Sequence, residues 1–87
     1  MNYLHYDLSL DSDDIVVVTL DKQANVRLLN DINFSNYQRG ERHTYYGGRA
    51  IRSPIKIPAP SAGHWHLVVD LGGAAGTVQA SVSTVKG

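Results

Sequence analysis

The chain has no cysteine, so it forms no disulfide and offers no thiolate to a metal ion. Small secreted domains often depend on disulfides, and this absence favours a reducing compartment, the cytoplasm. Long apolar runs are also missing. The longest, Ile15–Val18, has four residues, against the roughly 20 that cross a bilayer. Because the first residues also lack the basic and apolar regions of a signal peptide, we expect a cytoplasmic protein with no membrane association.

Helical periodicity is scarce, whereas strand patterns recur about every ten residues with turn residues between them. In the clearest strand, Trp65, Leu67, Val69 and Leu71 lie on one face, and the side chains between them lie on the other. Trp65 is therefore expected in the core. The pattern predicts an all-β fold, a small antiparallel β-sandwich of about seven or eight short strands, in which one sheet can be bent or bulged. We expect a single domain over residues 1–87.

Other segments carry more specific expectations. The alternation over residues 2–10 predicts a strand, and Ile15–Leu20, apolar on both faces, predicts a central strand covered on both sides. Residues 31–40 are rich in asparagine and predict a loop or short edge strand, anchored by Ile32 and Phe34. A strand over residues 43–46 is expected to end at two glycines. The strand over residues 49–57, broken near Pro54, is expected to lie at a sheet edge or to carry a bulge.

The net charge of zero conceals an uneven distribution of charge. Residues 1–26 hold five aspartates and one lysine, whereas residues 27–56 hold five arginines and one lysine against two acids. Such asymmetry indicates an anion-binding face or a self-complementary interface between copies of the chain. Alternatively, the acidic and basic segments lie on neighbouring strands and neutralise each other.

Several segments together resemble a small bacterial family of all-β domains of unknown function, found alone or beside TIR domains. The segments are His5-Tyr6-Asp7-Leu8, Asn33-Phe34-Ser35-Asn36-Tyr37, Tyr45-Tyr46-Gly47-Gly48 and Gly63-His64-Trp65-His66-Leu67-Val68-Val69-Asp70-Leu71-Gly72-Gly73. The resemblance covers essentially the whole chain and implies a β-sandwich with an irregular second sheet. It also implies an accessory sensing or assembly module, but it transfers no catalytic residues.

Two histidines on the clearest strand form the first candidate site. His64 and His66 leave the same face of the strand, and Asp70 follows on that face. Imidazole and carboxylate ligands suit zinc, iron or manganese, and a similar His-x-His pattern begins the metal site of cupin sandwiches. No histidine follows His66, however, so only His5 or His43 could complete the set. The alternative is two ordinary histidines on a partly exposed sheet face, or a pH-sensitive patch.

Arginines and tyrosines in the middle of the chain form the second candidate site. Arginine binds phosphate or carboxylate through two hydrogen bonds, and tyrosine supplies flat apolar area. A pI near 6.9 makes a nucleic-acid partner unlikely by comparison with dedicated nucleic-acid binders. The candidate contacts for a small anionic ligand or a protein partner are Tyr37, Arg39, Arg42, Tyr45, Tyr46 and Arg49.

Catalytic motifs are missing from the sequence. It contains no Gly-x-Ser-x-Gly elbow, and the glycine-rich segment 72–76 precedes no predicted helix, so it is expected to be a hairpin connection and not a phosphate loop. We therefore predict a non-enzymatic binding or interaction module without a cofactor, using the arginine and tyrosine face and able to self-associate. The alternative function is a small metal site on His64, His66 and Asp70, which could support catalysis.

Overall fold

The computed structural model describes residues 3–87. In order along the chain, the elements are β1 (Tyr3–Leu10), β2 (Asp14–Leu20), β3 (Ala24–Leu29), α1 (Asp31–Gln38), β4 (Tyr46–Ala50), β5 (Ile55–Pro58), β6 (Gly63–Asp70) and β7 (Ala80–Lys86). The predicted all-β class is confirmed. Within the described residues, seven strands form two antiparallel sheets.

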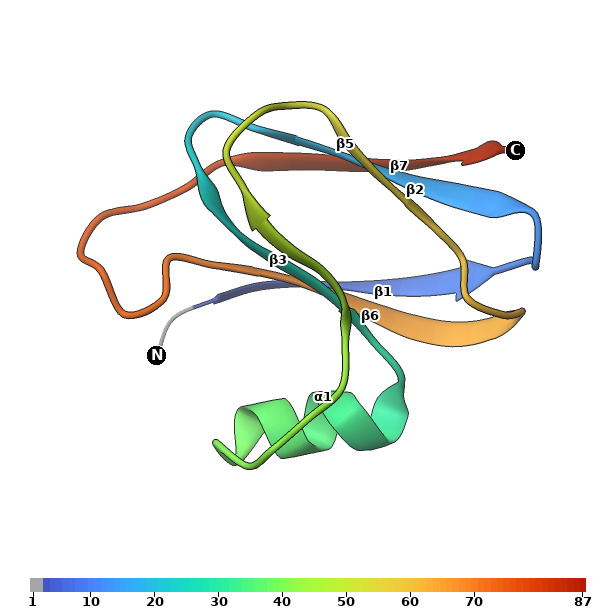
Figure 1. Ribbon diagram of the computed structural model, residues 1–87, viewed down its shortest axis with the longest axis horizontal. Coiled ribbons are helices and arrows are strands. Elements are labelled where there is room, and N and C mark those ends of the chain that lie inside the picture. The colour runs from blue at the N-terminus through green and yellow to red at the C-terminus, as the bar shows by residue number, and fades with distance from the viewer. Residues whose placement is uncertain (1–2) are drawn as a thin grey trace.

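The two sheets stack face to face, and α1 forms a third layer beyond the larger sheet (Figure 1). The larger sheet has the order β1-β6-β3-β4, and the smaller has the order β5-β2-β7. The strands that come late in the chain thus pair with the earliest ones, β6 with β1 and β7 with β2. The predicted antiparallel sandwich is confirmed.

The main core lies between the sheets and follows the alternation of the strands. Trp65, Leu67 and Val69 of β6 pack there against Val16 and Val18 of β2, as the sequence pattern predicted. Both valines are fully buried, whereas Ile15 and Val17 are only partly buried and Thr19 is exposed. The expectation that this strand is covered on both sides was wrong, because only the larger sheet has a third layer over its outer face.

The helix α1 is the largest departure from the predicted structure. The segment expected as a loop or edge strand is a helix of eight residues, capped by the Asn30 side chain, which accepts a hydrogen bond from the backbone N–H of Asn33. Phe34 and Tyr37, one turn apart, pack with Leu29 against the outer face of the larger sheet. Ile32, expected as an anchor, is 72% exposed.

Strand β4 begins later than predicted and runs through the glycines instead of ending at them. Gly47 has a φ of 121°, and a Cβ at this position would lie 2.4 Å from the carbonyl oxygen of Val26 on the neighbouring strand. Only glycine permits this close approach. The strand after Pro54 is β5, which lies at the edge of the smaller sheet, as predicted.

The described residues contain no helix long and apolar enough to cross a membrane.

Candidate functional site

Strand pairing brings acidic and imidazole side chains together on the outer face of the larger sheet. In the β1–β6 register, Asp7 lies opposite His66, and His5 lies two residues before Asp7 on the same face. His64 lies two residues before His66. The helix then adds Asp31, its first residue, from the connection that follows β3. We refer to His5, Asp7, Asp31, His64 and His66 as the histidine–aspartate cluster.

Three ligand atoms of this cluster converge on one region at the start of α1. The Oδ1 atom of Asp31 lies 2.6 Å from Nε2 of His66 and 2.9 Å from Nδ1 of His64. All three atoms lie within 4.8 Å of one another. Ligand atoms around one tetrahedral zinc ion lie roughly 3.3 Å apart, because each bond measures about 2.0–2.1 Å. The two separations from Asp31 therefore need to widen by less than about 1 Å to match the spacing in a zinc site.

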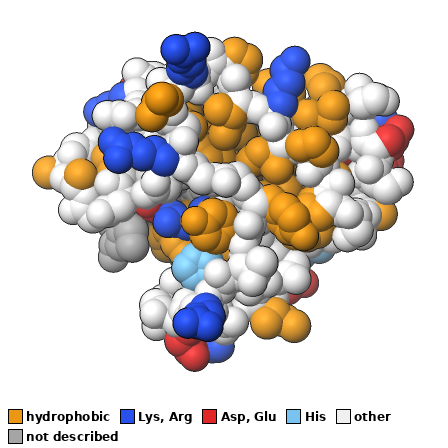
Figure 2. Space-filling model, viewed as in Figure 1, with side chains coloured by type: hydrophobic (Ala, Val, Ile, Leu, Met, Phe, Trp, Pro, Cys, Tyr) orange, Lys and Arg blue, Asp and Glu red, His pale blue; other side chains and the backbone are white. Residues whose placement is uncertain are grey.

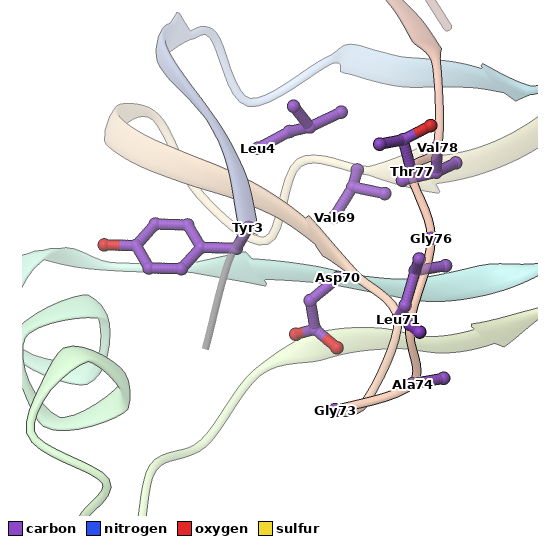
Figure 3. A pocket seen from close by; sticks show the side chains of 11 residues that line it. Tyr3, Leu4, Val69, Asp70, Leu71, Gly73, Ala74, Gly76, Thr77 and Val78 are labelled. Atoms are coloured by element: carbon purple, nitrogen blue, oxygen red, sulfur yellow. The ribbon is translucent and has the colours of Figure 1, made fainter.

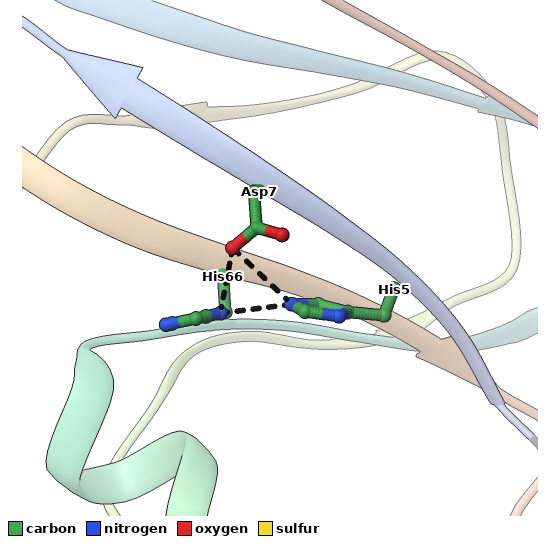
Figure 4. Close-up of side chains that lie close together, drawn as sticks. All are labelled: His5, Asp7 and His66. Carbon is green, nitrogen blue, oxygen red and sulfur yellow. Dashed lines mark hydrogen bonds and ion pairs between the residues drawn. The ribbon is translucent and has the colours of Figure 1, made fainter.

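The other nitrogen of each histidine faces an acceptor on β1. Nε2 of His64 lies 3.0 Å from Oδ1 of Asp7, and Nδ1 of His66 lies 2.8 Å from Nε2 of His5. The same carboxylate oxygen of Asp7 is 3.4 Å from Nδ1 of His66. Figure 4 shows the side chains of His5, Asp7 and His66 together. Histidines that bind metals usually donate their second N–H to a carboxylate, a backbone carbonyl or water, which fixes the tautomer and the ring orientation. Asp7 is such an acceptor for His64.

Aromatic packing holds the rings of the cluster in place. Phe34 stacks on His5 at 4.2 Å and on His66 at 4.3 Å between ring centroids. The His66 side chain is 8% exposed, whereas the side chains of His64 and Asp31 are 50% and 68% exposed. The cluster thus combines one buried, oriented imidazole with two ligands that open to solvent, which gives an ion a path of entry.

Hydrogen bonding also sets the charge of the cluster. The hydrogen bond from His66 lowers the pKa of Asp31 below its ordinary value, and the nearby His64 adds to this effect. Asp31 is therefore an ionised acceptor at neutral pH. A negative charge at the first residue of a helix also interacts favourably with the helix dipole.

Asp70, the third candidate metal ligand predicted on this strand, belongs to a different network. It accepts hydrogen bonds from Tyr37 at 2.7 Å, from Asn25 at 3.0 Å and from the backbone N–H of Gly72, and it forms an ion pair with Arg27. Burial raises the pKa of Asp70, but these hydrogen bonds and the arginine outweigh burial, so the net shift is downward. In the structure, Asp31 lies beside the two histidines, and Asp70 does not.

Tyr37 is fixed in the same network. Burial raises the pKa of its phenol, and the hydrogen bond to the Asp70 carboxylate raises it further. The guanidinium of Arg27 lies 5.5 Å from the centre of the Tyr37 ring and 5.1 Å from that of Tyr45, close enough for cation–π attraction to both. Tyr37 is therefore part of the packing under α1.

Each of the remaining predicted arginine and tyrosine contacts has its own surroundings in the structure. Arg39 pairs with Glu41 at the end of α1, and the Tyr46 ring packs edge-on against Trp65. Arg49, on β4, donates a hydrogen bond to the side-chain oxygen of Gln23 at 3.3 Å. The side chain of Arg42 is exposed. On the face shown in Figure 2, lysine and arginine side chains are separated from one another.

The acidic and basic segments do not neutralise each other. In the first 26 residues, the acids pair with Lys86, with histidines or, in the case of Asp21, with a backbone N–H. Among the described residues, none of these acids forms an ion pair with the basic segment 27–56. The alternative of mutual neutralisation was therefore wrong.

Sequence reasoning identified His64 and His66 but did not assign Asp7 or Asp31 to the site. The alternation in β1 places His5 and Asp7 on one face, but only the pairing of β1 with β6 brings them to the histidines. No pattern in the sequence shows that pairing, because 61 residues separate His5 from His66. Asp31 depends on a helix that the sequence did not predict.

The whole chain, residues 1–87, matches a family described as a domain of unknown function, DUF1883. No curated protein and no solved structure matches it.

Proposed function

We propose that this chain, which belongs to the DUF1883 family of domains of unknown function, is a binding module for a divalent transition-metal ion. The ligands are Nδ1 of His64, Nε2 of His66 and a carboxylate oxygen of Asp31, with solvent or a partner in the fourth position. Two imidazoles and one carboxylate suit zinc and its neighbours in the first transition series. The proposal assigns binding, and not catalysis, to this site.

One observation carries the proposal: the second ring nitrogen of each histidine faces a side chain of β1 that can accept a hydrogen bond, and for His64 this is the carboxylate of Asp7. With Nδ1 of His64 facing the ion, its Nε2–H donates to Asp7 at 3.0 Å. With Nε2 of His66 facing the ion, its Nδ1–H donates to His5 at 2.8 Å. These outer partners leave Nδ1 of His64 and Nε2 of His66 free for the ion, with His64 as the Nε2–H tautomer and His66 as the Nδ1–H tautomer.

A second group of ligand atoms, from His5, Asp7 and His66, is the weaker candidate. Its atoms are separated by 2.8, 3.4 and 3.8 Å, and it uses the opposite nitrogen of the same His66 ring. A neutral imidazole has one lone pair in the ring plane for a metal, so His66 serves one group at a time. The more exposed group with Asp31 is the one we assign.

Zinc binding to tag-free protein tests the proposal. We expect isothermal titration with zinc chloride to show one ion per chain, and cobalt(II) to show the visible absorption of a tetrahedral site. Loss of an outer partner of a metal ligand typically costs 10–100-fold in affinity, so loss of the ligand itself in His64→Ala should cost at least about 100-fold. His64 is half exposed, so this variant is expected to keep its fold.

His43→Ala is the matched control. The His43 ring hydrogen-bonds to the backbone carbonyl of Glu41, outside the cluster, so this variant should bind zinc like the unmodified protein. Asp31→Ala provides a second, exposed ligand variant. The proposal fails if the unmodified protein binds no stoichiometric zinc, or if the His43 variant loses as much affinity as the two ligand variants.

The cellular setting is a further part of the proposal. The absence of cysteine supports work in a reducing compartment, the cytoplasm. The sequence resemblance supports a bacterial origin and a role as an accessory module beside TIR domains. Purification of the intact protein from its native host, followed by fractionation and metal analysis, tests the location and the metal together.

A further inference from the structure

The positive charges of this domain are less well compensated than the negative ones. Within residues 3–87, each of the eight acidic side chains contacts a histidine, a lysine, an arginine or a backbone N–H. Three of the eight lysines and arginines form these ion pairs, namely Arg27, Arg39 and Lys86. The five cations without an acidic partner among the described residues are Lys22, Arg42, Arg49, Arg52 and Lys56.

Two of these five cations line one cavity. The cavity has a volume of about 540 Å³ and lies between the β2–β3 turn, which carries Lys22, strand β4, which carries Arg49, and the loop after β6. Gln23 and Asn25 add amide groups to its wall. No acidic side chain lines it among the described residues. Two unpaired cations facing one acid-free cavity create a positive potential inside it.

The neighbouring cavity shows the opposite character. It shares Leu71, Ala74 and Ala75 of the same loop, has a volume of about 350 Å³ and contains the Asp70 carboxylate (Figure 3). Its described lining includes no lysine or arginine. The loop after β6 therefore separates a cavity without cations from a cavity with two cations, and the second offers the charge that an anion requires.

We propose that the cavity between Lys22 and Arg49 binds a small organic phosphate monoester. Arg49 provides a planar pair of donors that matches two phosphate oxygens, and Lys22 adds a compact positive charge. Leu71, Ala74 and Ala75 supply apolar surface for the organic part of the ester. This site is separate from the histidine–aspartate cluster and shares no residue with it.

Backbone geometry supports a close approach at this loop. A Cβ at Gly72 would lie 3.0 Å from the side-chain nitrogen of Asn25, and a Cβ at Gly76 would lie 3.9 Å from the Lys22 ammonium nitrogen. Both glycines have positive φ, 65° and 114°. The loop therefore lies against the turn and strand that carry the polar groups, and Gly72, which lines this cavity, adds no side chain to it.

Amide NMR with phenyl phosphate as the probe tests the proposal, with EDTA present so that metal binding plays no part. We expect shift changes confined to residues 22–25, 48–50 and 71–76, with saturation. Each lost ionic contact to phosphate should weaken binding about tenfold or more, so Lys22→Ala/Arg49→Ala should abolish the saturable change.

Arg52→Ala/Lys56→Ala is the matched control, because it removes the same charge from exposed, unpaired residues outside the cavity. This variant should bind phenyl phosphate like the unmodified protein. Equal weakening in both double variants would mean diffuse charge attraction and would overturn the proposal. Inorganic phosphate binding as tightly as phenyl phosphate would also overturn it, because the apolar wall would then contribute nothing.

Discussion

Two regions on the same sheet face, both covered by α1, use their polar side chains differently. At one end, Asp70, Arg27 and Tyr37 form a network in which the Asp70 side chain is 1% exposed and holds an ion pair and several hydrogen bonds. At the other end, His64 and Asp31 are at least half exposed. In the first region, both oxygens of the Asp70 carboxylate are already bonded to protein groups, whereas the second region has ligand atoms that solvent can reach.

This difference separates a structural role from a binding role. A buried charge stabilises the fold only together with its partners, because removal of one partner leaves the charge buried and unpaired. Exposed pairs contribute little to stability and exchange partners easily. We therefore expect substitutions at the buried network to change the free energy of unfolding, and substitutions at the histidine–aspartate cluster to change binding.

Asp70→Asn should give the largest loss of stability. It removes the buried charge that pairs with the partly buried Arg27, so we expect a loss of about 3 kcal/mol in the free energy of unfolding. Urea unfolding followed by the fluorescence of Trp65, the single tryptophan, measures it. Asp13→Asn, at an exposed carboxylate near Lys86, is the control and should change stability little.

The loss of stability in the Asp70→Asn variant should depend on pH. The pKa of Asp70 is lower in the folded state than its ordinary value of 3.8. The ionised carboxylate therefore contributes fully to the free energy of unfolding above about pH 4, and this contribution is lost as the pH falls. The stability gap between the unmodified protein and the Asp70→Asn variant should therefore narrow below about pH 4. A gap that stays constant into strong acid would contradict the assignment.

Tyr37→Phe should have the next largest effect. It removes the hydroxyl that donates to Asp70 at 2.7 Å, and a buried hydrogen bond to a charged group is worth about 2 kcal/mol. Because folding raises the pKa of Tyr37, this stabilisation is complete below its ordinary value of 10.0 and declines as the pH rises above it. Tyr45→Phe, on the other ring beside Arg27, is the control, and equal losses in both variants would contradict the prediction.

His64→Ala should have the smallest effect on stability when metal is removed with EDTA. The side chain is 50% exposed and its contacts are to exposed carboxylates, so we expect a change within about 0.5 kcal/mol. Urea unfolding of both proteins, with and without zinc, measures the change. If the metal-free variant loses as much stability as Tyr37→Phe, the contrast between the two regions does not hold.

The alternation of side chains along strands predicted much of the fold. It placed Trp65, Leu67 and Val69 in the core and the two histidines of β6 on the other face. It failed for α1, whose eight residues bury only Phe34 and Tyr37 and show no apolar stripe. Such a helix depends on its cap and on packing against the sheet, and neither is visible in a local pattern.

The candidate site was predictable only in part, for a related reason. His64 and His66 lie close in sequence and share a strand face, so their proximity follows from local geometry. Asp7 reaches them through the register of β1 against β6, and Asp31 reaches them through the position of α1. Both depend on tertiary structure, which explains why Asp70, the nearest same-face acid in sequence, was chosen in place of Asp31.

The strand order of the larger sheet has a consequence for biosynthesis. β6 is the strand that joins β1 to β3, so the first half of the chain cannot assemble this sheet while it emerges from the ribosome. Until residues 63–70 are synthesised, β1 has no neighbour in its sheet and remains open to incorrect pairing with other chains. A newly made chain is thus most prone to aggregation just before β6 is translated, and chaperone binding should matter most at that stage.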